Sequence, residues 1–182
     1  MFIQTEQTPN PATLKFLPGR TIMAKGTAHF AHAESAAASP LALRLFDIDG
    51  VTAVFFGADF VSVTKHDSLE WYVLKPSILG ALMEHLTAGL PIVEETDDAS
   101  VPETDDDEVV TQIKDLLDTR VRPAVAMDGG DIIFHGFEEG VVYLQMQGAC
   151  QGCPSSTATL KMGVENLLKH YVPEVARVEA VL

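Results

Sequence analysis

Cysteine and positive charge are both scarce in this chain of 182 residues. There are only two cysteines, Cys150 and Cys153, whereas a secreted disulfide scaffold normally needs four or more. The pair therefore indicates a reducing compartment. Lys and Arg number 12 against 26 Asp and Glu, for a net charge of -14. Because binding to a phosphate backbone relies on clustered Lys and Arg, the composition argues against nucleic acid as a partner.

Long apolar runs are also missing. No run approaches the roughly 18–20 residues that span a bilayer, so no membrane partner is expected. Residues 1–11 contain no basic segment followed by an apolar stretch, as a targeting signal would. We therefore predict a soluble cytoplasmic protein. The hydrophobic fraction of 47% is nevertheless enough for a packed core, which excludes wholesale disorder.

The charge is distributed unevenly along the chain. Residues 94–107 carry eight acidic residues and no basic one. Like charges without aromatic residues repel one another and cannot bury apolar surface, so this segment is predicted to be an extended acidic linker. A docking segment for a basic partner is the less favoured alternative. The linker divides the chain into predicted domains at 1–93 and 108–182.

The first domain shows a mixture of helical and strand patterns. Helices are predicted at 41–46 and 76–87, and strands at 51–56 and 60–64 flank a glycine-containing turn that is typical of a hairpin. Residues 71–73, Trp-Tyr-Val, are expected in the core rather than on a partner surface, because large aromatic side chains are usually buried. Together these patterns predict a small α+β domain.

The second domain is predicted to have the order α-β-β-α-β. A helix begins near Asp105 and ends at Arg122-Pro123, and the turn at 128–131 follows it. The remaining elements are strands at 132–137, 141–147 and 175–181 and a helix at 154–171 with apolar residues from Leu160 to Tyr171 along one stripe. The predicted fold class is thus α+β, with two small α+β domains joined by an acidic linker.

Both cysteines lie in the segment Gly148-Ala149-Cys150-Gln151-Gly152-Cys153-Pro154, between a predicted strand and a predicted helix. The positive end of a helix dipole lowers the pKa of nearby thiols and stabilises anionic sulfur. Glycines without Cβ atoms let backbone amides approach a bulky anionic ligand. The segment is therefore suited to hold thiolates.

A single C-x-x-C motif leaves four interpretations open: a zinc half-site, a thiol oxidoreductase, half of an iron–sulfur site, or two inert buried thiols. Iron–sulfur clusters and structural zinc are commonly held by four thiolates, and this chain supplies two. A symmetric homodimer would complete either set. The oxidoreductase interpretation is weakened because only eleven residues follow Tyr171 and no aromatic residue immediately precedes Cys150.

Several motifs resemble a known family. Arg-Pro-Ala-Val-Ala-Met-Asp-Gly-Gly-Asp-Ile at 122–132, the cysteine segment continued to Ser156, and Thr-Leu-Lys-Met-Gly-Val-Glu at 159–165 look like the NifU-like C-terminal domain of Nfu iron–sulfur proteins. The first domain is similar to the Nfu N-terminal domain at 7–11, 14–19, 39–42 and 50–61. The resemblance covers nearly the whole chain except the linker.

The resemblance implies a carrier or scaffold rather than an enzyme. Such a protein receives a 4Fe-4S cluster from upstream cluster assembly proteins and hands it to apo iron–sulfur client proteins. The cluster would bridge the two subunits of a homodimer through Cys150 and Cys153 of each, and the first domain would contribute to recognition of targets. The alternatives are a thiol–disulfide oxidoreductase, with Cys150 as nucleophile and Cys153 as resolving thiol, and a structural zinc-bridged dimer.

Overall fold

The computed structural model describes residues 2–94, 107–150 and 154–181. The chain divides into two compact units, Met1–Asp98 and Ala99–Leu182. Each unit combines helices with its own sheet, which confirms the predicted two-domain α+β class. Nearly all of the acidic segment 94–107 lies outside the described residues, so its role as a linker and the domain boundaries stay predictions.

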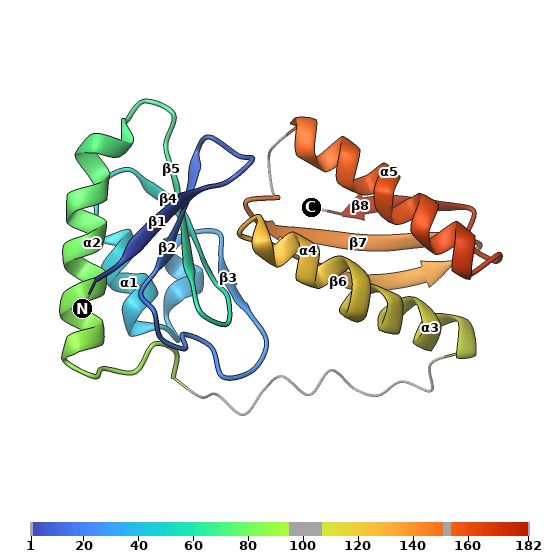
Figure 1. Cartoon of the computed structure of the whole chain (residues 1–182), viewed down its shortest axis with the longest axis horizontal. Helices are drawn as coiled ribbons and strands as arrows, with labels where there is room; N and C mark the ends of the chain where they lie inside the picture. Colours follow the sequence, from blue (N-terminus) through green and yellow to red (C-terminus); the bar gives the residue numbers. More distant parts are fainter. Residues whose placement is uncertain (1, 95–106, 151–153, 182) are drawn as a thin grey trace. The chain divides into compact units, whose positions relative to one another are not determined.

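The first unit is built on a five-stranded antiparallel sheet (Figure 1). The strands lie in the order β1-β2-β5-β4-β3. Their bounds are β1 Gln4–Gln7, β2 Thr13–Leu17, β3 Ala28–Phe30, β4 Val51–Phe56 and β5 Val61–Lys65. The predicted hairpin is confirmed as β4 and β5, whereas β1, β2 and β3 were not predicted.

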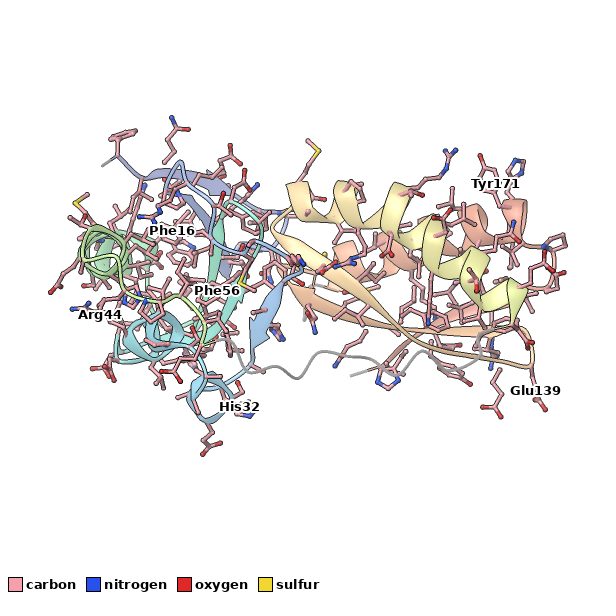
Figure 2. The ribbon with its side chains drawn as sticks, turned by 90° about the horizontal axis from the view of Figure 1, so that it is seen from below. Phe16, His32, Arg44, Phe56, Glu139 and Tyr171 are labelled. Atoms are coloured by element: carbon pink, nitrogen blue, oxygen red, sulfur yellow. The ribbon has the colours of Figure 1, made fainter. Side chains whose placement is uncertain are left out.

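Over residues 2–94 the helices that accompany this sheet are the 3-10 helix η1 (Ala33–Ala36), α1 (Pro40–Phe46) and α2 (Trp71–Thr87). The start of α1 follows from local chemistry, because the Ser39 side chain accepts a hydrogen bond from the Ala42 amide at 3.1 Å. Phe16 and Phe56, fully buried, lie in the core of this unit (Figure 2). Ile78 and Leu82 of α2 belong to the same core.

Helix α2 differs from the prediction in two ways. It begins at Trp71 rather than at Pro76, so the proline lies inside the helix. Proline removes one backbone hydrogen bond there, but Pro76 is on the exposed side, where water can satisfy the carbonyl of Tyr72. The core assignment of 71–73 is wrong for two residues: Tyr72 is 79% exposed and Val73 is 52% exposed. Trp71 is partly buried.

The second unit has the order α-β-β-α-β, as predicted, with a three-stranded sheet β6-β7-β8. Strands β6 and β7 are antiparallel, and the crossover through α5 makes β8 parallel to β7. The elements are α3 Glu108–Leu116, the π-helix η2 Leu117–Val121, α4 Arg122–Met127, β6 Gly130–Glu138, β7 Val141–Gly148, α5 Pro154–Tyr171 and β8 Arg177–Val181.

The prediction that the first helix of this unit ends at Arg122-Pro123 is wrong. Instead η2 follows α3 directly and α4 continues to Met127. A π-turn changes the hydrogen-bond spacing, so Pro123, which has no N–H to donate, is accommodated in the first turn of α4. As a result, Arg122 stands in a helix that packs against the sheet rather than in a loop.

The core of the second unit is formed by helix and sheet residues that include Ile113, Ile132, Leu144 and Leu168. Cys150 belongs to the same core. Figure 2 shows Glu139, in the β6–β7 turn, and Tyr171, at the end of α5, at one end of this unit. Tyr171 is 40% exposed, so the predicted apolar stripe does not extend to it. In the part of the chain that the structure describes, no helix is long and apolar enough to cross a membrane.

Candidate functional site

Cys150 lies in the connection between β7 and α5, two residues after the strand ends at Gly148. Its side chain is packed into the core of the second unit, and the residue is 6% exposed. The second predicted ligand, Cys153, lies outside the described residues and its role stays a prediction. The strand-to-helix position predicted for Cys150 is confirmed.

Hydrogen bonds fix the backbone on both sides of Cys150. The amide of Ala149 donates to the carbonyl of Gly129 at 3.2 Å, which ties the cysteine segment to the turn before β6. The Thr157 hydroxyl, in the first turns of α5, donates to the carbonyl of Cys150 at 3.0 Å. Gly129 has φ of 80° and Gly148 has φ of 65°, a conformation that glycine adopts without steric cost. The cysteine is therefore held by β6, β7 and α5 together.

Gly130, the first residue of β6, provides the space that the cysteine side chain occupies. A Cβ atom built on Gly130 would lie 2.6 Å from the Cys150 sulfur and 2.8 Å from the Gln147 carbonyl oxygen. Neither distance is compatible with a real side chain, and the carbonyl belongs to the β7 backbone, which cannot rotate away. Gly130 is thus part of the packing that sets the position of Cys150.

Next to Gly130, an ion pair joins helix α4 to strand β6. The guanidinium of Arg122 donates from Nε and Nη2 to the two carboxylate oxygens of Asp131, both at 2.9 Å. The Asp131 side chain is 3% exposed, and one of its oxygens also accepts the Ile132 amide at 2.8 Å. Hydrogen bonding to Asp131 raises the pKa of Arg122 above its ordinary value, so the guanidinium stays charged. Such a bidentate pair fixes geometry as well as charge.

A metal ion needs a set of donor side chains that lie close together. Within residues 2–94, 107–150 and 154–181, no group of three or more His, Cys, Asp or Glu side chains is placed to hold a metal ion. The two histidines with buried ring atoms belong to the first unit: His85 contacts the Pro91 carbonyl at 2.9 Å, and burial lowers the pKa of His29.

Sequence reasoning missed the roles of Arg122, Gly130 and Asp131. The sequence favours a turn that needs positive φ at residues 128–131 over a segment that lines the cluster environment, and positive φ is correct for Gly129. This prediction did not anticipate that Gly130 packs on the cysteine or that Asp131 pairs with Arg122. The available signal was the Asp-Gly-Gly-Asp motif, in which two adjacent glycines exceed what one turn requires.

Two family models match the chain, one for each unit. "Scaffold protein Nfu/NifU N terminal" matches residues 3–89, and "NifU-like domain" matches residues 113–179. The human protein "NFU1 iron-sulfur cluster scaffold homolog, mitochondrial" is 52% identical over 184 residues, covering 100% of this chain and 72% of the relative. The chain belongs to the Nfu family.

Two other curated relatives are similar to this chain over 98% or more of its length. "NifU-like protein 4, mitochondrial" of Arabidopsis thaliana is 53% identical, with 98% of this chain and 65% of the relative covered. The Drosophila ananassae protein of the same name as the human one is 52% identical over the whole chain, which spans 64% of that relative. A solved NifU-like protein from Saccharomyces cerevisiae matches 53% of this chain and 87% of its own, at 25% identity and a TM-score of 0.48.

The prediction of a cytoplasmic protein is contradicted by these relatives. The human, fly and plant proteins, all about half identical to this chain, are named as mitochondrial. The prediction rested on the cysteine content and on the absence of a targeting pattern in residues 1–11. Scarce cysteines distinguish reducing from oxidising compartments, but they do not distinguish one reducing compartment from another.

Proposed function

We propose that this Nfu chain is an iron–sulfur cluster carrier. It accepts a 4Fe-4S cluster on Cys150 and Cys153, with the cluster bridging two copies of the chain, and it transfers the cluster to apo iron–sulfur proteins. Cluster assembly proteins supply the cargo. The names of the curated relatives, which call them iron–sulfur cluster scaffolds, support this role at the level of the family.

The observation that carries the proposal is the position of Cys150. Cys150 lies between the end of strand β7 and the start of the eighteen-residue helix α5. Cysteines before a helix N-terminus are commonly used as thiolate ligands, because the helix dipole favours negative charge there. Soft thiolates select iron–sulfur clusters, zinc and Cu(I) over hard cations. We assign the donors to the cargo to Cys150 and Cys153, the two thiols of the chain.

Two thiolates per chain also explain why the cluster should be released. Four-thiolate ligation requires a second copy of the chain, so the cargo would lie at a subunit interface rather than inside one core. An incoming client thiolate can then replace one cysteine at a time. Each exchange breaks one iron–sulfur bond to the carrier and forms one to the client, without a net change in oxidation state.

In this proposal the first unit binds partner proteins, and the acidic segment connects it to the second unit. The sequence predicts an extended linker at 94–107, and a flexible linker of about fourteen residues would have an r.m.s. span of roughly 20 Å or more. A partner bound to the first unit would therefore experience the cluster at a raised effective concentration. This task needs no metal ligand in the first unit, and the sequence places both cysteines after residue 107.

Anaerobic reconstitution with iron and sulfide tests the proposal. We expect the wild-type chain to gain cluster absorption with iron and acid-labile sulfide in equal amounts, and Cys150→Ser or Cys153→Ser to lose most of it. Circular dichroism of the variants shows whether the fold is intact. Normal loading of the double variant would place the site elsewhere. Zinc without sulfide would favour the zinc dimer, and a stable Cys150–Cys153 disulfide with dithiol exchange activity would favour the oxidoreductase.

A further inference from the structure

The first unit carries a groove that the proposed cluster chemistry does not use. A cavity of about 580 Å³ lies between strand β1 and helix α2. Its walls include Thr5, Gln7, Pro9, Pro11, Trp71 and Lys75. One side is therefore formed by β1, the β1–β2 turn and the start of β2, and the other by the start of α2. A groove between a strand and a helix can accept an extended polypeptide.

Strand β1 is an edge strand. It stands at the end of the order β1-β2-β5-β4-β3 and, as far as the described residues go, pairs with β2 alone (Figure 1). Alternate residues of an edge strand direct backbone N–H and C=O groups away from the sheet, where another strand can bind them. The register of β1 with β2 contains no bulge, and the one charged side chain of β1, Glu6, lies 3.6 Å from Lys15. An added sixth strand would thus meet a regular edge.

The side chains of an added strand would alternate between the two faces of the sheet. Thr5 and Gln7 are opposite Phe16 and Leu14, whose side chains are buried in the core, so Thr5 and Gln7 share the core-side face. The groove opens on this face because both residues line it. Every second side chain of an added strand would therefore enter the groove and approach α2.

Trp71 gives the groove a fixed aromatic wall. Its indole Nε1 donates to the Pro11 carbonyl at 3.0 Å, and the residue packs partly against the core. The ammonium of Lys65 lies 5.9 Å from the centre of its ring. A ring held in place in this way offers contact area at little cost in conformational entropy.

The charge of the groove selects the kind of peptide. Lys75 is the one charged residue among the described residues that line it, although acidic residues in the chain outnumber basic ones by 26 to 12. In the described part of the chain, the side chain of Lys75 makes no ion pair or hydrogen bond. Since none of the described residues that line the groove is a carboxylate, an acidic side chain of a peptide would complement Lys75.

We propose that the groove binds an extended peptide segment of a partner protein, added to β1 as a sixth strand with an Asp or Glu side chain facing Lys75. The assignment rests on the proposed function, in which the first unit engages the partners of cluster transfer. It makes that task specific, because it names the surface, the backbone geometry and the charge of the partner segment.

The test selects a phage-displayed library of random peptides of about twelve residues on the full-length chain. We expect the enriched peptides to alternate β-branched and polar residues and to carry Asp or Glu. Synthetic copies should bind Lys75→Glu about tenfold more weakly or worse, while the matched charge reversal Lys25→Glu, at an exposed loop residue, changes the affinity by less than about twofold. Replacing the peptide acid by Gln should weaken binding to the wild-type chain similarly.

Hydrogen exchange gives a readout that charge alone would not produce. Bound peptide should slow exchange at backbone amides of β1, because these amides would donate to the added strand. Enrichment of basic peptides, no enrichment, or equal binding to both charge variants would overturn the proposal. Self-association of the chain that Lys75→Glu abolishes would instead make the groove a contact between copies, and would overturn it too. Cluster loading of each variant is measured in parallel, so that failure of the cluster site is distinguished from failure of the groove.

Discussion

The two units of this chain use the same kinds of element but close their cores differently. The core of the first unit is completed by apolar side chains such as Phe16, Phe56 and Leu82. The core of the second unit includes Cys150, the proposed cluster ligand. Core packing in the second unit therefore sets the position of the proposed ligand Cys150. The core of the first unit contains no cysteine and holds the helices and strands of that unit together. Matched changes in the two cores should separate stability from cluster binding.

The largest effect is expected when one buried leucine of each core is shortened. Leu144 and Leu82 are both fully buried, so Leu144→Ala and Leu82→Ala should each lower the stability of their own unit by about 2–5 kcal/mol. Only Leu144→Ala should lower the temperature at which a loaded cluster is lost. Cluster absorption during heating measures this temperature. If Leu82→Ala lowers that temperature equally, the two units are coupled and the comparison fails.

Gly130→Ala should disturb the cysteine directly. The new Cβ would meet the Cys150 sulfur and the Gln147 carbonyl. We therefore expect the free energy of unfolding of the second unit to fall by about 1–3 kcal/mol and cluster loading to weaken. Gly136→Ala, in the same strand, is the matched control, because no atom lies within 4 Å of its new Cβ. Denaturant unfolding and reconstitution of both variants check this, and equal behaviour would remove Gly130 from the site.

The ion pair between α4 and β6 should contribute less than core packing. Asp131→Asn removes the buried carboxylate that pairs with Arg122. We expect the free energy of unfolding of the second unit to fall by about 1–3 kcal/mol, a moderate loss because the guanidinium is partly exposed to water. Asp118 binds the same guanidinium at 3.0 Å but is exposed, so Asp118→Asn should cost below about 0.5 kcal/mol. Urea unfolding measures both, and a similar cost for the two would mean that burial of Asp131 is unimportant.

The smallest effect is a pH dependence confined to the first unit. Burial lowers the pKa of His29 below its ordinary value of about 6.5, so the unfolded chain binds the proton more readily. The neutral histidine favours the folded state fully above that pH, and stability should fall as the pH drops below it. Trp71, the one tryptophan in the sequence, reports unfolding of this unit by fluorescence. His29→Gln should reduce the difference in urea midpoint between about pH 7.5 and about pH 5.5. If the variant shows the same difference as the wild type, other groups cause the pH dependence.

The sequence predicted best where a local pattern decides the structure. Helix α5 has the predicted bounds, 154–171, because an apolar stripe follows a proline suited to the first helical position. Strands β6 and β7 were predicted because two strand-like runs are joined through residues 138–140, Glu-Glu-Gly. In the structure Glu139 and Gly140 both have positive φ at this connection. The strand-to-helix position of Cys150 followed from these elements.

Prediction failed where distant residues decide. Strand β1 is short and polar, so its sequence has no apolar pattern that would predict a strand. It forms a strand because it pairs with β2. The continuation of the helix past Arg122-Pro123 depends on a π-turn, which sequence periodicity does not reveal. The contact of Gly130 with Cys150 joins residues twenty positions apart, and no spacing rule links a glycine to a thiol.

The central claim, that two chains share one cluster, is tested most directly by anaerobic sedimentation of the reconstituted full-length chain with iron and sulfide analysis. Because each chain supplies two thiolates, the account predicts that cluster absorption sediments with a dimer holding about four irons per two chains. The apo chain at the same concentration gives the reference. A cluster-loaded monomer, in buffer without any added thiol ligand, would contradict the account.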